Sequence, residues 1–157
     1  MAVITISREP GALGEEVAAR VAGLLGFLLV DRARLAQFRQ EMDLDEASLT
    51  KVDQGNAREG CVVDSESVAS VRLLPDLIAQ LVVDHDLVVI GRGGQGLFHN
   101  CPGTLHVRIV ASRQFRVRQV QSHRGLSARE ARRHIMDLET RRSRYVRFVY
   151  RLNWADP

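Results

Sequence analysis

Short apolar runs alternate along this 157-residue chain with longer segments in which apolar residues recur every three or four positions. The short runs at 2–6, 27–30, 87–90 and 104–111 are rich in Val, Ile and Leu, as expected of strands buried on both faces. The segments between them have the period of helices with one buried face. Strands that alternate with helices in this way predict an α/β fold, with a parallel sheet and crossover helices.

The first strand, turn and helix, over 2–25, form the most informative unit. The turn contains Gly11 and Gly14, and the helix carries Val17 and Val21 on its apolar stripe. This order of elements directs the N–H groups of a helix N-terminus toward a phosphate. An ordinary connection from strand to helix has the same outline. Phosphate binding and simple chain reversal therefore both remain open.

The turn departs from the pattern Gly, four residues, Gly, Lys, then Ser or Thr, that binds phosphates in P-loops. If the second glycine is Gly14, then Glu9, Glu15 and Glu16 replace the first glycine, the lysine and the hydroxyl. Carboxylates at a helix start are stabilised by the helix dipole. At about 4 Å and an effective dielectric constant of about 20, however, each would repel a phosphate charge by about 4 kcal/mol. Binding would then need arginines from elsewhere in the chain.

Two charged residues follow strands, at the end where α/β sheets bind their ligands. Arg92 lies between Gly91 and Gly93, which leave space around a single charged group, so we favour a ligand-binding role for it. Asp31 follows the strand at 27–30 and is equally suited to cap the next helix. Both interpretations of Asp31 stay open.

A single domain over 1–157 is expected from the length of the chain. Within it, 33–83 is predicted to be a helical insert whose long helix, over 64–83, is kinked or split in two by Pro75. The segment 124–151 is predicted to be a lid-like, arginine-rich helical segment that begins with a Ser-x-x-Glu capping box. Because its apolar stripe is narrow, we expect this last helix outside the main core.

Positive charge is concentrated late in the chain. Residues 1–107 carry 9 Lys and Arg against 15 Asp and Glu, whereas 108–151 carry 13 Arg against 3 acidic residues. The planar guanidinium group binds phosphate with paired hydrogen bonds, so such a segment suits a polyanionic ligand. A nucleotide, a nucleic acid and plain solubility all remain open on this ground.

Other features exclude several classes of protein. No apolar run approaches the roughly 20 residues of a membrane span, and the N-terminus lacks the pattern of a signal peptide. The two cysteines, Cys61 and Cys101, form neither a metal-binding spacing nor a disulfide framework. We therefore expect a cytoplasmic protein without membrane association.

Several short motifs together, in this order over essentially the whole chain, resemble the cytidylate kinase-like family. They are the opening Ile6-Ser7-Arg8-Glu9, the glycine-bearing turn, Asp31-Arg32, Gly91-Arg92-Gly93, Val107-Arg108-Ile109, and Arg142 with Tyr145 ahead of Trp154-Ala155-Asp156-Pro157. The resemblance implies a P-loop NTPase-like fold of the nucleoside monophosphate kinase type. It also implies Mg²⁺-dependent phosphoryl transfer from ATP to CMP, dCMP or a related pyrimidine nucleoside monophosphate.

The resemblance also implies roles for particular residues, by their position in the motifs. The turn that binds the phosphates of ATP would consist of Arg8, Gly11, Ala12, Leu13, Gly14, Glu15 and Glu16. Asp31 and Arg92 would face the acceptor nucleotide. Arg141 and Arg142 would be catalytic lid arginines that neutralise the transferring phosphoryl group, as this reaction requires. No protein ligand for a metal is assigned.

Two departures from the family pattern shape the remaining expectations. The family turn runs Gly-Ser-Gly-Gly and then a basic residue, whereas this chain has Gly11-Ala12-Leu13-Gly14-Glu15. The family also continues into a further strand, without which the strand at 104–111 would be an unpaired edge. We expect a shortened chain, or a homodimer in which a second copy completes the sheet.

Two alternatives to a kinase stay open. One is a non-catalytic nucleotide-binding or interaction module, because the turn is altered. The other is nucleic-acid binding through the arginine-rich segment 108–151, whose charge is sufficient to contact several phosphates.

Overall fold

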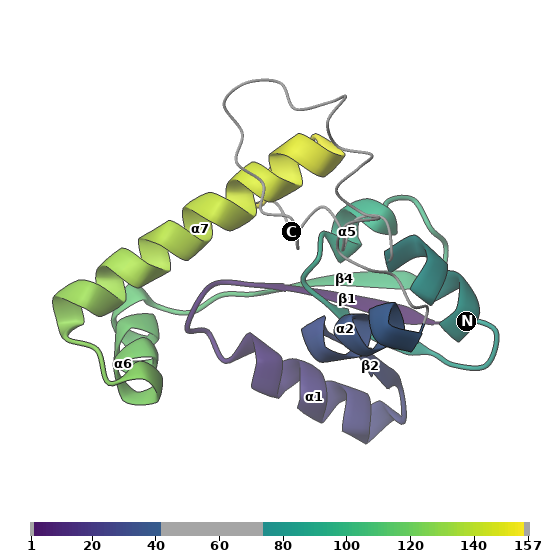
Figure 1. Cartoon of the computed structure of the whole chain (residues 1–157), viewed down its shortest axis with the longest axis horizontal. Helices are drawn as coiled ribbons and strands as arrows, with labels where there is room; N and C mark the ends of the chain where they lie inside the picture. Colours follow the sequence, from purple (N-terminus) through teal and green to yellow (C-terminus); the bar gives the residue numbers. More distant parts are fainter. Residues whose placement is uncertain (1, 42–73, 156–157) are drawn as a thin grey trace.

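The computed structural model describes residues 2–41 and 74–155 (Figure 1). Its described strands form one parallel sheet in the order β2-β3-β1-β4. They are β1 (Val3–Arg8), β2 (Leu28–Val30), β3 (Leu87–Ile90) and β4 (Thr104–Ile109). The predicted α/β fold with a parallel sheet is confirmed. Most of the predicted insert 33–83, with the first half of its predicted helix over 64–83, lies outside the described residues.

The described helices include α1 (Gly14–Leu25), α2 (Arg32–Glu41), α5 (Gly94–Leu97), α6 (Arg113–Arg124) and α7 (Ala128–Tyr150). Residues 74–81 are also helical. Most of these elements begin and end within a few residues of the sequence prediction. The exception is α5, a single short turn of helix inside the segment that the sequence presents as a glycine-rich loop. In the described part of the chain no helix has the length and apolar character that a bilayer crossing requires.

The strand β1 lies at the centre of the sheet. It pairs with β3 from Val3–Leu87 to Ile6–Ile90, and with β4 along its other edge. The chain passes from β1 over β3 to reach β2, and later from β3 over β1 to reach β4. These connections diverge at the carboxyl ends of β1 and β3, which is where open α/β sheets bind ligands.

Among the described residues, β2 forms one edge of the sheet and β4 forms the other. The strand β4 therefore pairs with β1 alone. This is the position expected for the strand at 104–111. The guanidinium group of Arg108 on this strand lies 4.5 Å from the ring centroid of Trp154, and it also donates to the Trp154 carbonyl. Trp154, the first residue of the Trp-Ala-Asp-Pro motif, therefore packs beside the edge strand.

Apolar side chains cover both faces of the sheet. On one face, Val3 and Val89 pack with residues from α2, α5 and 74–81. On the other, Ile6 and Val88 pack against α1, where the fully buried Ala18 lets the helix approach closely. Both faces of β1 and β3 are thus buried, as their unbroken apolar sequences require.

The helices α6 and α7 form a hairpin with its own small apolar cluster. Val117 and Val120 of α6 pack against Ala131 and Ile135 of α7. None of these side chains belongs to the clusters that cover the sheet. Figure 1 shows α7 passing above the sheet, with its first turns beside α6 and its last turns near α5. A helix over most of the predicted segment 124–151 is therefore present and lies outside the main core, and its lid role stays a prediction.

A buried arginine joins this hairpin to the end of β1. Arg116 of α6 is only 9% exposed, and its Nη1 lies 2.5 Å from Oε1 of Glu139 on α7. Its Nε lies 3.3 Å from Oε2 of Glu9, which also accepts the N–H of Ala111 at 3.1 Å. One cation thus connects the first turn, α6 and α7. The sequence analysis did not identify this connection.

Arg116→Met should destabilise the protein by about 3 kcal/mol, which is near the lower end for a broken buried ion pair. The effect should not be larger, because the carboxylates of Glu9 and Glu139 are partly exposed to solvent. The thermal midpoint should fall by roughly 6 to 12 °C. Thermal unfolding followed by circular dichroism measures this. The control is Arg118→Met on the exposed side of the same helix, which should stay within about 0.5 kcal/mol of the wild type. Equal stability of the two variants would contradict a structural role for Arg116.

Candidate functional site

The turn between β1 and α1 adopts a tight backbone conformation. Gly11 and Leu13 both have left-handed backbones, with φ of 80° and 58°. A leucine there is unusual, and the conformation costs about 1–2 kcal/mol relative to the right-handed form. Leu13 is the N-cap of α1 and gives no side-chain cap to the helix. The first N–H groups of α1 are thus the polar groups that a ligand at this turn would meet.

The turn is packed too closely for larger residues at its glycines. A Cβ atom on Gly11 would lie 2.6 Å from the carbonyl oxygen of Arg116. A Cβ atom on Gly14 would lie 2.6 Å from the Cβ of Arg8. Glycine is therefore required at both positions, because α6 lies against Gly11 and the side chain of Arg8 lies against Gly14.

Glu15 binds Arg8. Its Oε1 accepts from Nε of Arg8 at 3.0 Å and from Nη2 at 2.5 Å. Burial tends to raise the pKa of Glu15, but the charge and hydrogen bonds of Arg8 outweigh it, so the pKa lies below its ordinary value of 4.5. The carboxylate is ionised at neutral pH and neutralises much of the positive charge of Arg8.

Arg142 reaches the same turn from α7. Its Nη1 donates to the carbonyl oxygen of Arg8 at 2.8 Å, across 134 positions of sequence. Burial and then repulsion by Arg8 lower the pKa of Arg142 to about 10, although Glu15 and Glu139 act in the opposite direction. Arg142 is still protonated at neutral pH. Two guanidinium groups are therefore held near one another beside the start of α1.

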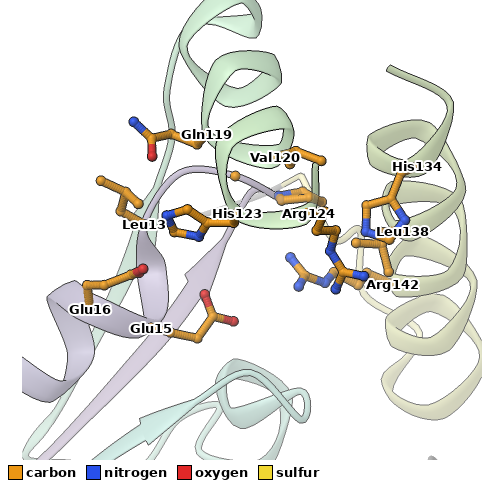
Figure 2. A pocket seen from close by; sticks show the side chains of 12 residues that line it. Leu13, Glu15, Glu16, Gln119, Val120, His123, Arg124, His134, Leu138 and Arg142 are labelled. Carbon is orange, nitrogen blue, oxygen red and sulfur yellow. The ribbon is translucent and has the colours of Figure 1, made fainter. Parts of the chain in front are cut away.

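A cavity of about 210 Å³ opens between this turn and the α6–α7 hairpin (Figure 2). Figure 2 shows Glu15 and Glu16 on one side of it, His123 and Arg124 on α6, and Arg142 on α7. Its full lining is Pro10, Gly11, Leu13, Glu15, Glu16, Gln119, Val120, His123, Arg124, His134, Leu138 and Arg142. The volume is smaller than the roughly 300–1,000 Å³ of typical ligand pockets, and suits a phosphate group better than a whole nucleotide.

The histidine on the α7 side of this cavity is neutral at physiological pH. Burial, and then the positive charge of Arg124, lower the pKa of His134 below its ordinary value of 6.5. The cavity thus has permanent positive charge from Arg124 and Arg142 and negative charge from its two glutamates.

The segment Gly91–Gly93 forms a second unusual turn, at the end of β3. Gly91, Arg92 and Gly93 have φ of 70°, 57° and 70°, so all three lie in the left-handed region. The carbonyl oxygen of Arg92 accepts from the hydroxyl of Tyr145 at 3.2 Å and from that of Tyr150 at 3.4 Å. A non-glycine residue in this region is held there by its surroundings and often marks a functional turn.

The two turns touch one another. The N–H of Gly91 donates to the carbonyl oxygen of Ile6 at 2.9 Å. A Cβ atom on Gly91 would collide with the guanidinium group of Arg8. The arginine that binds Glu15 therefore lies directly against the turn that carries Arg92.

Two other predicted site residues lie apart from these contacts. Oδ1 of Asp31 accepts the N–H of Arg34 at 2.8 Å, so Asp31 caps α2 as one of its two interpretations predicted. Arg141 is exposed on α7, next to the partly buried Arg142. Acceptor binding by Asp31 and a catalytic role for Arg141 stay predictions.

Most arginines of the segment 108–151 are exposed. Arg108, Arg116 and Arg142 are partly or fully buried, and the other ten face solvent. The sequence analysis did not foresee that Arg116 is structural or that the two tyrosines bind the Arg92 turn. Gly93 and Gly96 lie under the ring of Tyr150. These two glycines were the feature of the sequence that could have indicated the contact between the tyrosines and the Arg92 turn.

Comparisons with known proteins agree with this geometry. The model of the cytidylate kinase-like family matches residues 3–157. A search of curated proteins found no match. An uncharacterized protein from Eubacterium ventriosum ATCC 27560 is structurally similar, with a TM-score of 0.73 and 17% identity over 99% of this chain and 82% of that one. TT1252 from Thermus thermophilus is also similar, with a TM-score of 0.52 and 20% identity over 89% of this chain and 84% of that one.

At these identities the two structures support the α/β fold alone. The family match, by contrast, covers nearly the whole sequence, including the turns after β1 and β3 and the arginines of α7. The chain therefore belongs to the cytidylate kinase-like family.

Proposed function

We propose that this protein binds a nucleoside triphosphate at the β1–α1 turn and transfers its terminal phosphoryl group, slowly, to a pyrimidine nucleoside monophosphate such as CMP or dCMP. The observation that carries the proposal is the convergence of Arg8 and Arg142 beside the uncapped start of α1. Family membership supports a nucleotide as the ligand.

The charges at the turn favour a bound anion. Arg8 and Arg142 repel one another, and Arg142 is largely buried, where its charge is poorly solvated. A phosphate between them would relieve that repulsion and accept charge-assisted hydrogen bonds from both groups. Phosphoryl transfer depends mainly on this kind of positioning and charge neutralisation.

Glu15 is the reason for a slow reaction. Its carboxylate already accepts two hydrogen bonds from Arg8. A phosphate that binds Arg8 must share it with this carboxylate or displace it, and the remaining negative charge repels the phosphate. We therefore expect weak affinity for ATP and low turnover.

The acceptor would bind at the neighbouring turn. Arg92 follows β3 and its turn touches Arg8, so an acceptor phosphate held there would lie next to the donor phosphates. Asp31, at the end of β2, would contribute to the same side of the crevice. Arg141 would join Arg142 in neutralising the transferring group when the α7 side closes on the ligand.

Magnesium would enter with the nucleotide. Within residues 2–41 and 74–155 no cluster of three or more His, Cys, Asp and Glu side chains could hold a metal by itself. Mg²⁺ in kinases is held by one or two carboxylates together with substrate phosphates. Glu16, exposed in the first turn of α1 and lining the cavity, stands where a P-loop has the hydroxyl that holds Mg²⁺. The ion would neutralise charge on the phosphates.

The bond between Arg8 and Glu15 also favours a second candidate, a module that binds nucleotides without turnover. The two functions make the same prediction for binding and differ in whether CMP is phosphorylated. Nucleic-acid binding by the exposed arginines is a third candidate. It would be indicated by RNA affinity that falls steeply with salt and is not reduced by ATP.

Glu15→Lys combined with Glu16→Ser should raise the affinity for ATP with Mg²⁺ at least tenfold, because attraction replaces a repulsion of about 4 kcal/mol at close range. Titration calorimetry measures the affinity, and a coupled assay with CMP, dCMP and UMP measures turnover. If phosphorylation also rises, the scaffold is a working kinase. If affinity rises and turnover stays absent, the binding module is favoured.

The control for this variant is Asp84→Lys, an equal change of charge to that at Glu15, in the exposed turn before β3 at the opposite end of the sheet. It should leave the affinity for ATP within about twofold of the wild type, because solvent and salt screen exposed charges beyond about 10 Å. A similar gain in ATP affinity in both variants would show that the gain comes from the net charge of the protein and not from the turn. No heat of binding for any nucleotide with the wild-type protein, at low salt with Mg²⁺, would contradict the proposed function.

Arg142→Ala should weaken ATP binding at least tenfold, because a hydrogen bond to a charged group contributes about 1.5–3 kcal/mol. Arg144→Ala changes an exposed arginine two positions later on α7 and should have little effect. Arg92→Ala should reduce phosphorylation of CMP and leave ATP binding nearly unchanged. Calorimetry with each nucleotide separates these results, and equal losses for Arg142→Ala and Arg144→Ala would reject a specific role for Arg142.

A further inference from the structure

The C-terminal end of α7 is fastened to the turn that carries Arg92 by two tyrosines, Tyr145 and Tyr150, which we call the tyrosine latch. Both hydroxyl groups donate to one acceptor, the carbonyl oxygen of Arg92. The rings meet edge to face, with centroids 6.3 Å apart and an interplanar angle of 78°. Burial raises the pKa of Tyr150, so its hydroxyl keeps its proton at neutral pH.

The glycines next to Arg92 are shaped to receive this latch. A Cβ atom on Gly93 would lie 2.8 Å from Cδ2 of Tyr150, and one on Gly96 would lie 2.8 Å from its Cβ. The ring of Tyr150 therefore lies against bare backbone on both sides of the start of α5. Only glycine at these two positions allows α7 to approach so closely.

We propose that the tyrosine latch positions Arg92, by holding the Gly91–Gly93 turn in its left-handed form, and thereby links the acceptor side of the site to the phosphate side. The consecutive left-handed residues are unfavourable without support, and the two hydrogen bonds to Arg92 are contacts that supply it. Tyr145 and Tyr150 act through Arg92 and are positioning residues.

The link runs along a single helix. Arg142 contacts the carbonyl oxygen of Arg8 and lies one turn before Tyr145, so the same end of α7 is attached to both turns. The Gly91 backbone in turn packs against the guanidinium group of Arg8. A phosphate that binds Arg142 would therefore hold this end of α7, and with it the latch, more firmly against Arg92. In this respect the inference rests on the proposed function, and it predicts that donor and acceptor bind cooperatively.

Tyr145→Phe combined with Tyr150→Phe removes both hydroxyl groups and keeps both rings. In the nucleotide-free protein, we expect amide hydrogen exchange to rise at least tenfold at Gly94, Gly96 and Leu97, whose N–H groups bond within this segment. Exchange at Val17 in α1 should stay unchanged. The affinity for CMP should fall about tenfold and its dependence on an ATP analogue should disappear, while the affinity for the analogue alone stays within about twofold.

Gly96→Ala tests the same contact from the other side. Its Cβ atom would displace the ring of Tyr150, and Gly96 has no left-handed backbone to complicate the substitution. Like the double tyrosine variant, it should show faster amide exchange within residues 94–97 and a lower affinity for CMP. The matched control is Gly23→Ala in α1, where a Cβ atom has open space around it. This control should change neither the exchange at 94–97 nor the affinity for CMP.

Unchanged exchange at 94–97 in the double tyrosine variant would overturn the inference. So would faster exchange with wild-type affinity for CMP, because the latch would then be structural and would not position Arg92. A wild-type protein that binds no nucleotide would overturn the proposed function and the acceptor role of Arg92. The exchange data would in that case still decide whether the latch holds the turn.

Discussion

The hydrogen bond from Arg142 to the carbonyl oxygen of Arg8 closes the fold around its candidate site, by joining the last long helix to the end of the first strand. Neither partner is near the other in sequence. The contact exists because the sheet places β1 at its centre and the α6–α7 hairpin returns the chain across the carboxyl ends of the strands. The return brings Arg142 to the site, whereas the neighbouring Arg8–Glu15 pair forms within the β1–α1 unit.

The helix α7 makes this contact together with two others. Glu139 meets Arg116 of α6, and the tyrosine latch meets the carbonyl oxygen of Arg92. A continuous helix keeps its contacts in fixed relation, since its backbone hydrogen bonds resist bending. Because these partners come from α6, the β1 turn and the β3 turn, α7 acts as a rigid connector, and its own apolar cluster with α6 is small. Few of the arginines on α7 contact other elements of the fold, and most of them face solvent.

The electrostatics of the turn explain how a family member can keep its architecture while its phosphate-binding sequence changes. Glu15 stands where a P-loop has a lysine, yet the structure gives it a partner in Arg8. That pairing lowers the pKa of the carboxyl group despite burial, so the charge reversal is tolerated by the fold. For the proposed phosphate ligand we expect weaker binding, because the cation that would attract it is already bound to a carboxylate.

The sequence by itself determined the layered α/β fold and the places where chemistry could occur. The unbroken Leu, Val and Ile of β3, and the apolar and β-branched residues that open β1, indicate strands that are buried on both faces. Gly11, Gly14 and the glycines around Arg92 marked the two turns, because glycines directly after an apolar run indicate a turn in the sequence itself. Ser127 and Glu130 likewise marked the start of α7, and both hydrogen bonds of the capping box are present.

Only the tertiary structure decided which distant side chains meet. Glu15 turns onto Arg8, Arg116 is buried between Glu9 and Glu139, and Tyr145 with Tyr150 binds the Arg92 turn. Such pairings depend on the register of the sheet and the angle at which α7 crosses it, and neither leaves a periodic trace in the sequence. An arginine on a helix has the same local pattern whether it faces solvent or a buried carboxylate. For Asp31, too, the sequence could not separate two roles. A helix cap and a ligand-binding carboxylate both place an aspartate directly after a strand and before a helix.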